Sequence, residues 1–212
     1  MPFAKVNDAE IYYEVHGSGF PLVLSHTGRA GLADFAQNNT PVLAQRYQVV
    51  VYDRRGCGQS KAPEGSDSPE TWVQDLHGLL QHLGIQHAYI GGVSYGAMLS
   101  VEFTLAHPDM VAGLISSCGS PFGWGQGRPN AIPFPDRRDR LTSIRAPILW
   151  VYGENDQGFP PSMGEEAQGL TPGSELVVVQ GAGHSPQRDA PGVFNQALLD
   201  FLARVDARRA AA

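Results

Sequence analysis

The pentapeptide Gly92–Gly96, which reads Gly-Val-Ser-Tyr-Gly, constrains the fold of this chain more than any other feature. An apolar run at 88–91 precedes it and predicts a buried strand, and residues 97–107 after it predict a helix. A Gly-x-Ser-x-Gly motif between a strand and a helix is typical of a nucleophile elbow, a turn so sharp that the serine backbone is strained. The two glycines lack Cβ atoms and therefore let the strand and the helix approach closely. A tight turn with a capping serine can have the same motif, so the rest of the chain has to distinguish this alternative from a nucleophile elbow.

The order of the predicted elements indicates an α/β architecture. The chain opens with a predicted hairpin over residues 3–15. Apolar runs then predict strands at 22–24, 48–52, 88–91, 111–117, 147–152 and 175–179. The stretches between and after them predict helices at 34–45, 68–83, 97–107 and 191–205, with Ser68 as an N-cap. Continuous apolar strands separated by amphipathic helices favour a mainly parallel sheet that is covered on both faces.

Length and composition limit the class of protein. A chain of 212 residues suits one sizeable core, so we expect a single domain over residues 1–212. The net charge of -6 and the scattered Lys and Arg residues argue against nucleic-acid binding. Residues 1–19 lack a signal-peptide pattern, and no apolar run is long enough to cross a bilayer. Cys57 and Cys118 form no metal-ligand spacing. We therefore expect a cytoplasmic protein with reduced thiols and no membrane partner.

Two later loops offer a base and an acid for Ser94. A serine hydroxyl is a poor nucleophile until a base takes its proton, and an acid must hold that base in the right tautomer. His184 follows a predicted strand in a Gly-Ala-Gly-His context, and we predict it as the base. Glu154 and Asp156 compete for the role of the acid, and Asp156 is preferred because it lies further past its strand. The chain order Ser-Asp-His is the one expected on this topology.

The loop at 26–29, which reads His-Thr-Gly-Arg, is predicted to provide a donor for a developing oxyanion. One donor is expected to be the backbone N–H of Tyr95, directly after the serine. The second is expected to be the N–H of Gly28, with Thr27 as the alternative. We interpret His26 as a structural residue that braces this loop.

Residues 119–135 interrupt the alternation of strands and helices. The segment is rich in Gly and Pro and shows no helical or strand period. It lies at the edge where the strands end, and ligands bind at that edge in open α/β sheets. We predict that Phe122 and Trp124, together with Phe159, form walls of a substrate site. The same aromatic segment would also suit a homodimer interface, and this alternative stays open.

With these motifs, the chain resembles the α/β-hydrolase family, in its branch of esterases, enol-lactonases and non-haem perhydrolases. The resemblance runs almost end to end and depends on the pentapeptide and on the stretches at 52–60, 153–156 and 183–184. It implies an α/β-hydrolase fold with a mostly parallel eight-stranded sheet and helices on both faces. In this family the stretch from Asp53 to Ser60 is structural, so Asp53 is not expected to be the acid.

Three departures from the family pattern stand out. Thr27 replaces a glycine of the oxyanion loop, and Cys57 replaces a histidine. The helical cap that such proteins insert before residue 147 is shortened to residues 119–135, with at most a brief helix at 136–143. The cap is therefore expected to be minimal or absent.

The resemblance implies a serine carboxylic-ester hydrolase in which Ser94, His184 and Asp156 act through an acyl-enzyme. No metal or organic cofactor is required, and the expected substrate is a small-molecule ester or lactone in an open site. Lactone or enol-lactone hydrolysis and perhydrolysis use the same three residues and remain alternatives. A receptor-like protein of this fold that binds a ligand without turnover is a further alternative.

Overall fold

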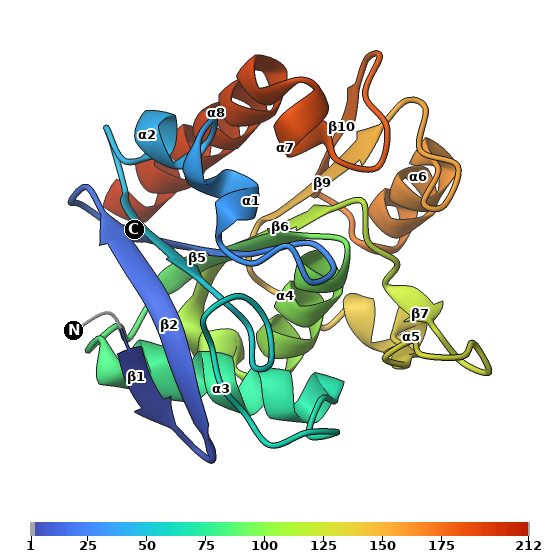
Figure 1. Cartoon of the computed structure of the whole chain (residues 1–212). Coiled ribbons are helices and arrows are strands. Elements are labelled where there is room, and N and C mark those ends of the chain that lie inside the picture. Colours follow the sequence, from blue (N-terminus) through green and yellow to red (C-terminus); the bar gives the residue numbers. More distant parts are fainter. Residues whose placement is uncertain (1–2, 212) are drawn as a thin grey trace.

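The computed structural model describes residues 3–211 and contains an eight-stranded sheet (Figure 1). The strand order is β1-β2-β4-β3-β5-β6-β9-β10. Strand β2 pairs antiparallel with β1 and β4, and the other neighbours are parallel, which confirms the predicted sheet. The bounds are β1 Phe3–Val6, β2 Ala9–His16, β3 Pro21–Ser25, β4 Gln48–Tyr52, β5 Ala88–Val93, β6 Val111–Ser117, β9 Ile148–Gly153 and β10 Glu175–Val179.

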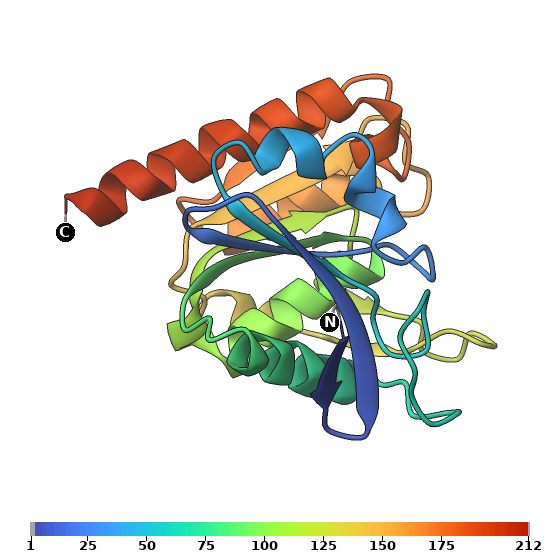
Figure 2. The same cartoon turned by 60° about the vertical axis from the view of Figure 1, so that its left-hand side comes forward.

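Helices cover both faces of the sheet (Figure 2). One face carries α3 (Pro69–His82), α4 (Tyr95–Ala106) and α6 (Pro161–Leu170). The other face carries α8 (Pro191–Ala210) together with the short helices α1 (Ala33–Ala36), α2 (Thr40–Leu43) and α7 (Pro186–Asp189). Between residues 3 and 211, no helix is both long and apolar enough to cross a membrane.

The two-sided burial explains why the strands appear as unbroken apolar runs. Successive side chains of a strand point to opposite faces, so a strand between two helical layers needs apolar residues throughout. In β5, Tyr89 packs into the cluster around α8, whereas Ile90 packs into the cluster around α3 and α4. All six residues of β5 are buried.

The start of α3 agrees with its sequence signals. The Ser68 hydroxyl accepts a hydrogen bond from the Thr71 N–H at 3.1 Å, and the Thr71 hydroxyl accepts one from the Ser68 N–H at 3.0 Å. This capping box satisfies two backbone donors at the N-terminus of the helix, where no intrahelical acceptor exists. Gly84 follows the last turn with a φ of 69°, a conformation that favours glycine.

Two predicted helices differ from those in the structure. The single helix predicted over 34–45 is instead the pair α1 and α2, because Pro41 has no N–H to continue a helix from α1. The C-terminal helix runs on to Ala210, past its predicted end at Val205. Helix α6 has no counterpart among the predicted elements.

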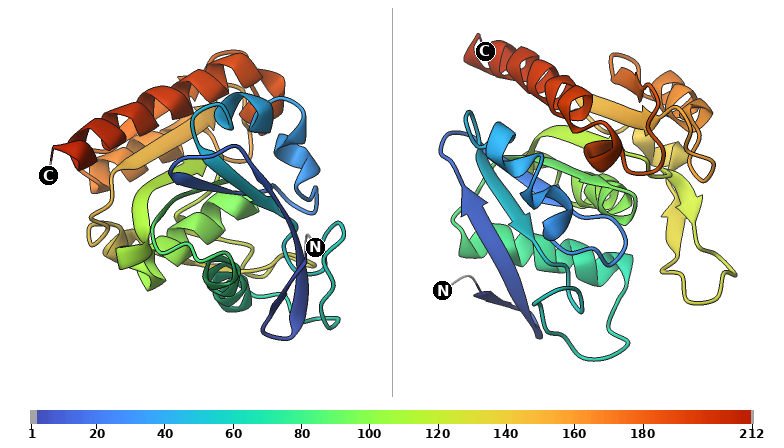
Figure 3. Two further views of the ribbon diagram at one scale, coloured as in Figure 1. Left: turned by 90° about the vertical axis from the view of Figure 1, so that its left-hand side faces the viewer. Right: turned by 45° about the horizontal axis from the view of Figure 1, so that its top comes forward.

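The segment at 119–135 also differs from its prediction. It contains a hairpin of β7 (Phe122–Trp124) and β8 (Phe134–Asp136), which Figure 3 shows projecting from the body of the molecule. Strands of three residues are too short to produce a recognisable sequence period. The brief helix predicted after it is α5 (Arg138–Leu141). A short hairpin and one helical turn therefore stand where other family members carry a helical cap.

The close contact between α4 and β3 leads to a first prediction, about the stability of a Gly96 variant. A Cβ atom on Gly96 would overlap the backbone carbonyl of Ser25, which cannot move without distorting the sheet. We expect Gly96→Ala to lower the free energy of unfolding by about 2–3 kcal/mol. Gly169→Ala is the control, because Gly169 is an exposed residue of α6 and its new methyl group would have no atom within 4 Å. In this variant the free energy of unfolding should rise by about 0.5–1 kcal/mol. Urea denaturation measures both, and equal effects would contradict the argument.

Candidate active site

Ser94 has the strained backbone that its motif predicts. Its φ of 56° and ψ of -118° lie in a sparsely populated region for a residue with a side chain. Its N–H donates to the Ser117 carbonyl on β6 at 2.9 Å, which fixes the turn to the sheet. The hydroxyl therefore lies at the carboxyl edge of the sheet, at the start of α4.

His184 and Asp156 lie in line with this hydroxyl. The His184 Nε2 is 3.0 Å from the Ser94 Oγ, and the His184 Nδ1 is 2.7 Å from the Asp156 Oδ2. Because a carboxylate only accepts hydrogen bonds, the Nδ1–H donates to Asp156, and Nε2 is left to accept the serine proton. The structure thus brings the three predicted residues together in hydrogen-bonding order.

The two competing carboxylates have different surroundings. Asp156 is buried, and its Oδ1 accepts hydrogen bonds from the backbone N–H groups of Gly158 at 2.9 Å and Phe159 at 3.0 Å. Glu154 instead accepts the Gly181 N–H at 2.9 Å and holds the loop that precedes the histidine. Asp156 is therefore the carboxylate that orients His184.

The two candidate donors in the loop at 26–29 differ in whether they are already hydrogen-bonded. The Thr27 N–H donates to the buried Asp34 carboxylate at 2.8 Å, so Thr27, the alternative donor, is already bound. The Gly28 N–H has no hydrogen-bond partner among residues 3–211, and neither has the Tyr95 N–H in the first turn of α4. Gly28 adopts a φ of 39°, which a glycine tolerates well.

His26 braces this loop as a neutral imidazole. Its Nε2 accepts the backbone N–H of Arg54 at 3.0 Å, so its Nδ1–H is left to donate to the Thr27 carbonyl at 3.0 Å. Burial, and next the charge of Arg54, lower the pKa of His26 well below 6.5. The side chain thus stays uncharged and structural, as interpreted from the sequence.

An open cavity of about 590 Å³ lies over the candidate residues. Trp124 from the hairpin and Phe159 form part of its wall, with ring centroids 4.9 Å apart. The Phe159 ring also stacks on the His184 ring at 5.3 Å. Phe122, the third predicted wall residue, does not line this cavity. It lies at the base of the hairpin beside α5, where the Arg138 guanidinium covers its ring at 4.6 Å.

Some lining residues were not singled out from the sequence. Asn155, Gln157 and Gly158 border the cavity because they flank Asp156 in the same loop. Their position past β9 is a usable sequence signal, since ligands bind at that edge. Asp34 carries no such signal, because its contact with the Thr27 N–H depends on the packing of α1 against the loop at 26–29.

Cys118, Asp156 and His184 place one possible metal-ligand atom each within 4.8 Å of one another. A metal ion would need the Cys118 thiolate, but burial raises the pKa of this thiol to about 12. The Nδ1 of His184 is also bound to Asp156. This donor set therefore does not fit a metal site.

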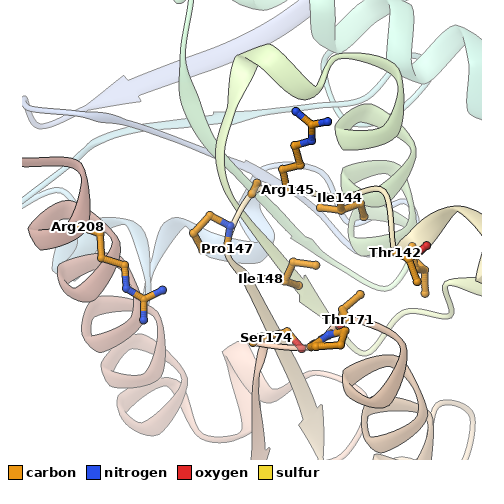
Figure 4. Close-up of a pocket in the computed structure, with 12 residues that line it drawn as sticks. Thr142, Ile144, Arg145, Pro147, Ile148, Thr171, Ser174 and Arg208 are labelled. Carbon is orange, nitrogen blue, oxygen red and sulfur yellow. Dashed lines mark hydrogen bonds between the residues drawn. The ribbon is translucent and has the colours of Figure 1, made fainter. Parts of the chain in front are cut away.

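A second cavity, of about 250 Å³, lies at the opposite edge of the sheet, before the starts of β9 and β10 (Figure 4). Its lining contains no Asp, Glu, His or Cys. Figure 4 shows the guanidinium groups of Arg145 and Arg208 on opposite sides of Pro147. The lining of this cavity thus offers neither a base nor converging charges, and the candidate catalytic residues lie at the other edge of the sheet.

Comparison with known proteins agrees with the fold. The model of the alpha/beta hydrolase fold matches residues 21–138 and 135–191. The chain belongs to this alpha/beta hydrolase family. It is 26% identical to a putative carbamate hydrolase, RutD, of Azorhizobium caulinodans, over 97% of this chain and 100% of that protein. It is 27% identical to a 2-hydroxy-6-oxononadienedioate/2-hydroxy-6-oxononatrienedioate hydrolase of Pseudomonas putida, over 94% and 95%.

Solved structures of other proteins have the same fold. A thermophilic esterase from Thermogutta terrifontis superposes with a TM-score of 0.88 and 23% identity, over 96% of this chain and 98% of that one. An enol-lactonase from Burkholderia xenovorans superposes with a TM-score of 0.88 and 22% identity, over 95% and 100%. At these identities the likeness establishes the fold alone. With the curated hydrolase relatives, it identifies the chain as a hydrolase of this fold.

The buried His26 makes the folded state sensitive to acid. Below pH 6.5 the unfolded chain takes up a proton at this residue that the folded chain does not, so stability falls as the pH falls. Each pH unit costs up to about 1.4 kcal/mol until the folded protein itself is protonated. We expect the free energy of unfolding to decrease between pH 7.5 and 5.0, and to decrease less in His26→Asn.

Urea denaturation at both pH values measures this dependence. The exposed His87 provides the control, and His87→Asn should lose as much stability in acid as the unmodified protein. An equal acid loss in His26→Asn and the unmodified protein would contradict the assignment.

Proposed function

We propose that this protein is a serine carboxylic-ester hydrolase. The observation that carries the proposal is the line of hydrogen bonds from Ser94 through His184 to Asp156, at 3.0 and 2.7 Å. A serine at the elbow suits an acyl-enzyme mechanism. The curated relatives are named as a carbamate hydrolase and as a 2-hydroxy-6-oxononadienedioate hydrolase, which supports hydrolysis but leaves the bond to be tested.

In the proposed mechanism, the Ser94 Oγ attacks the ester carbonyl while His184 Nε2 takes its proton. The Asp156 carboxylate stabilises the imidazolium that forms. The negative charge moves to the carbonyl oxygen, where the N–H groups of Tyr95 and Gly28 donate hydrogen bonds. The C–O bond then breaks, and His184 gives the proton to the leaving alkoxide. Water attacks the acyl-enzyme, with His184 again as the base, and releases the acid.

The shape of the site favours substrates larger than a simple acetate. The alignments to the curated relatives run over 254 to 272 residues, more than the 212 residues of this chain, so those proteins carry segments that it lacks. The two parts of the family match overlap at residues 135–138, where the hairpin ends and α5 begins. A hairpin in place of a cap leaves the cavity open to bulky acyl or alcohol groups, and it excludes water less completely.

Substitution of the acid tests the assignment of roles. We expect Ser94→Ala to abolish turnover of p-nitrophenyl butyrate, and Asp156→Asn to lower kcat by about 10³–10⁴-fold because the imidazole then loses its tautomer and its counter-charge. The matched control is Glu154→Gln, which keeps an oxygen for the Gly181 N–H and should retain kcat within about twofold. If Glu154→Gln is the more damaging change, the assignment of the acid is wrong.

The type of bond is tested with paired substrates. A p-nitrophenyl ester and the p-nitrophenyl carbamate of the same size compare the proposed reaction with the one in the name of a relative. Faster hydrolysis of the ester, lost in Ser94→Ala, supports the proposal. Hydrolysis of the carbamate alone, or of a lactone alone, would replace the carboxylesterase assignment with that reaction.

Trp124 and Phe122 provide a matched pair for the substrate wall. Trp124 lines the cavity, whereas Phe122 lies under Arg138. We expect Trp124→Ala to lower kcat/KM by about tenfold for a long acyl chain and much less for acetate, since a lost apolar contact is worth about 1–2 kcal/mol. Phe122→Ala should leave the chain-length profile unchanged. Identical chain-length profiles in the two variants would contradict a contact between the acyl chain and Trp124.

A further inference from the structure

Arg54 is a buried cation without a carboxylate partner. It is only 2% exposed, and no carboxylate oxygen within residues 3–211 lies within 4 Å of its nitrogen atoms. Its neighbour Arg55 is equally buried but pairs with Asp75 at 2.7 Å and with Asp8 at 3.0 Å. The two consecutive arginines are thus alike in burial and opposite in pairing.

An unpaired buried charge does little for stability. Removing a guanidinium from water is costly unless ion pairs and hydrogen bonds replace the lost hydration. Burial lowers the pKa of Arg54, and its Nε has no hydrogen-bond partner in the part of the chain that the structure describes. The Trp72 ring, 4.7 Å from the guanidinium, provides a cation–π contact as partial compensation. Such a residue needs an explanation other than stability.

The hydrogen bonds of Arg54 converge on the oxyanion loop. Its guanidinium donates to the carbonyls of His26 and Gly28, and its backbone N–H donates to the His26 ring at 3.0 Å. These carbonyls lie on either side of the peptide that joins Thr27 to Gly28. The carbonyl of that peptide accepts from the His26 Nδ1–H and from the Ala30 N–H at 3.1 Å.

These contacts fix the direction of the Gly28 N–H. In a planar peptide the N–H points opposite to the C=O, so holding the Thr27 carbonyl inward directs the Gly28 N–H outward. Gly28 has a φ of 39°, and a Cβ atom on it would meet nothing within 4 Å, so packing does not confine this residue. The Arg54 bonds to the carbonyls of His26 and Gly28 therefore restrain the two neighbouring peptides, which packing leaves free at Gly28.

We propose that Arg54 is a positioning residue that holds the Gly28 N–H toward the oxyanion, while its unneutralised charge favours the anionic intermediate. This inference rests on the proposed function. Arg54 touches the loop and not the substrate, so it acts through Gly28. If Arg54 were purely structural, replacing it would lower stability but leave the activity of each folded molecule intact.

The test compares Arg54→Met and Arg54→Lys with Arg55→Met and Arg55→Lys on a p-nitrophenyl ester. Activity is normalised to active sites counted by exhaustive fluorophosphonate labelling of Ser94. A second readout is the affinity for phenylboronic acid, which forms an anionic tetrahedral adduct with a serine. Thermal melting of each variant reports its stability.

We expect Arg54→Met to lower kcat by about 30–100-fold with KM within about twofold, because loss of a whole oxyanion donor costs about 10²–10³-fold. Phenylboronic acid should bind more weakly by a similar factor. Arg54→Lys keeps the charge but cannot hold both carbonyls, and its kcat should fall about tenfold. Arg55→Met should show the larger fall in Tm and a kcat within about twofold of the unmodified protein.

The outcomes separate this inference from the proposed function. A kcat and a boronate affinity in Arg54→Met that equal those of the unmodified protein would overturn the inference, although ester hydrolysis stands. Absence of ester turnover in the unmodified protein would overturn the proposed function instead. If Arg54→Met does not fold, the comparison of Arg54→Lys with Arg55→Lys decides. A fall in kcat in Arg54→Lys alone supports the inference. A kcat in Arg54→Lys equal to that of Arg55→Lys overturns it.

Discussion

The close contact of the turn at Gly92–Gly96 with strand β3 is the constraint on which the rest of the site depends. A Cβ atom at Gly92 would meet the backbone of Gly96 and the carbonyl of Ser25, and one at Gly96 would meet the backbone of residues 25 and 26. Only two glycines allow α4 to start so near to β3. The strain at Ser94 follows from this approach, and it is maintained because β3, β5, β6 and α4 are all buried around the turn.

Once the elbow is in place, parallel pairing brings the other groups to it. The loops that carry Gly28, Ser94, Asp156 and His184 follow β3, β5, β9 and β10, and all four strands end at one edge of the sheet. The carboxyl ends of parallel strands share an edge, so residues far apart in sequence become neighbours. The sheet therefore sets distances that no local segment could set.

Buried polar contacts then connect these loops to one another. The Asp34 carboxylate accepts the Thr27 N–H at 2.8 Å, and it also accepts from the Gln187 side chain at 2.9 Å and the Arg188 Nε at 2.6 Å. It thereby ties the loop at 26–29 to α7, which begins two residues after His184. Arg54 holds the same loop from the other side. In the proposed mechanism, such a network would orient the backbone donors before a substrate arrives, so that they can stabilise a developing charge.

The sequence alone determined the parts of this protein that depend on local pattern. Two-sided burial makes strands such as β5 and β6 continuous apolar runs. The N-cap of α3 at Ser68 and the two glycines around Ser94 also have local causes, so the sequence predicts all of these features. Ser94 and His184 were predicted because each follows a strand in a recognisable context. The preference for Asp156 over Glu154 rested on position alone, and only the direction of each side chain in the folded loop distinguishes them.

Only the tertiary structure decided the remaining features. The hairpin at 122–136 is too short to show a period, and Phe122 and Trp124 separate because one lies beside α5 and the other beside Phe159. The sequence favours Gly28 over Thr27 as a donor but leaves both open, and only the packing of α1 brings Asp34 to the Thr27 N–H. The same holds for Arg54 and Arg55, adjacent residues of one type that differ in pairing because packing gives carboxylates to only one within residues 3–211. Contacts between distant segments set these choices, and a linear pattern carries no information about them.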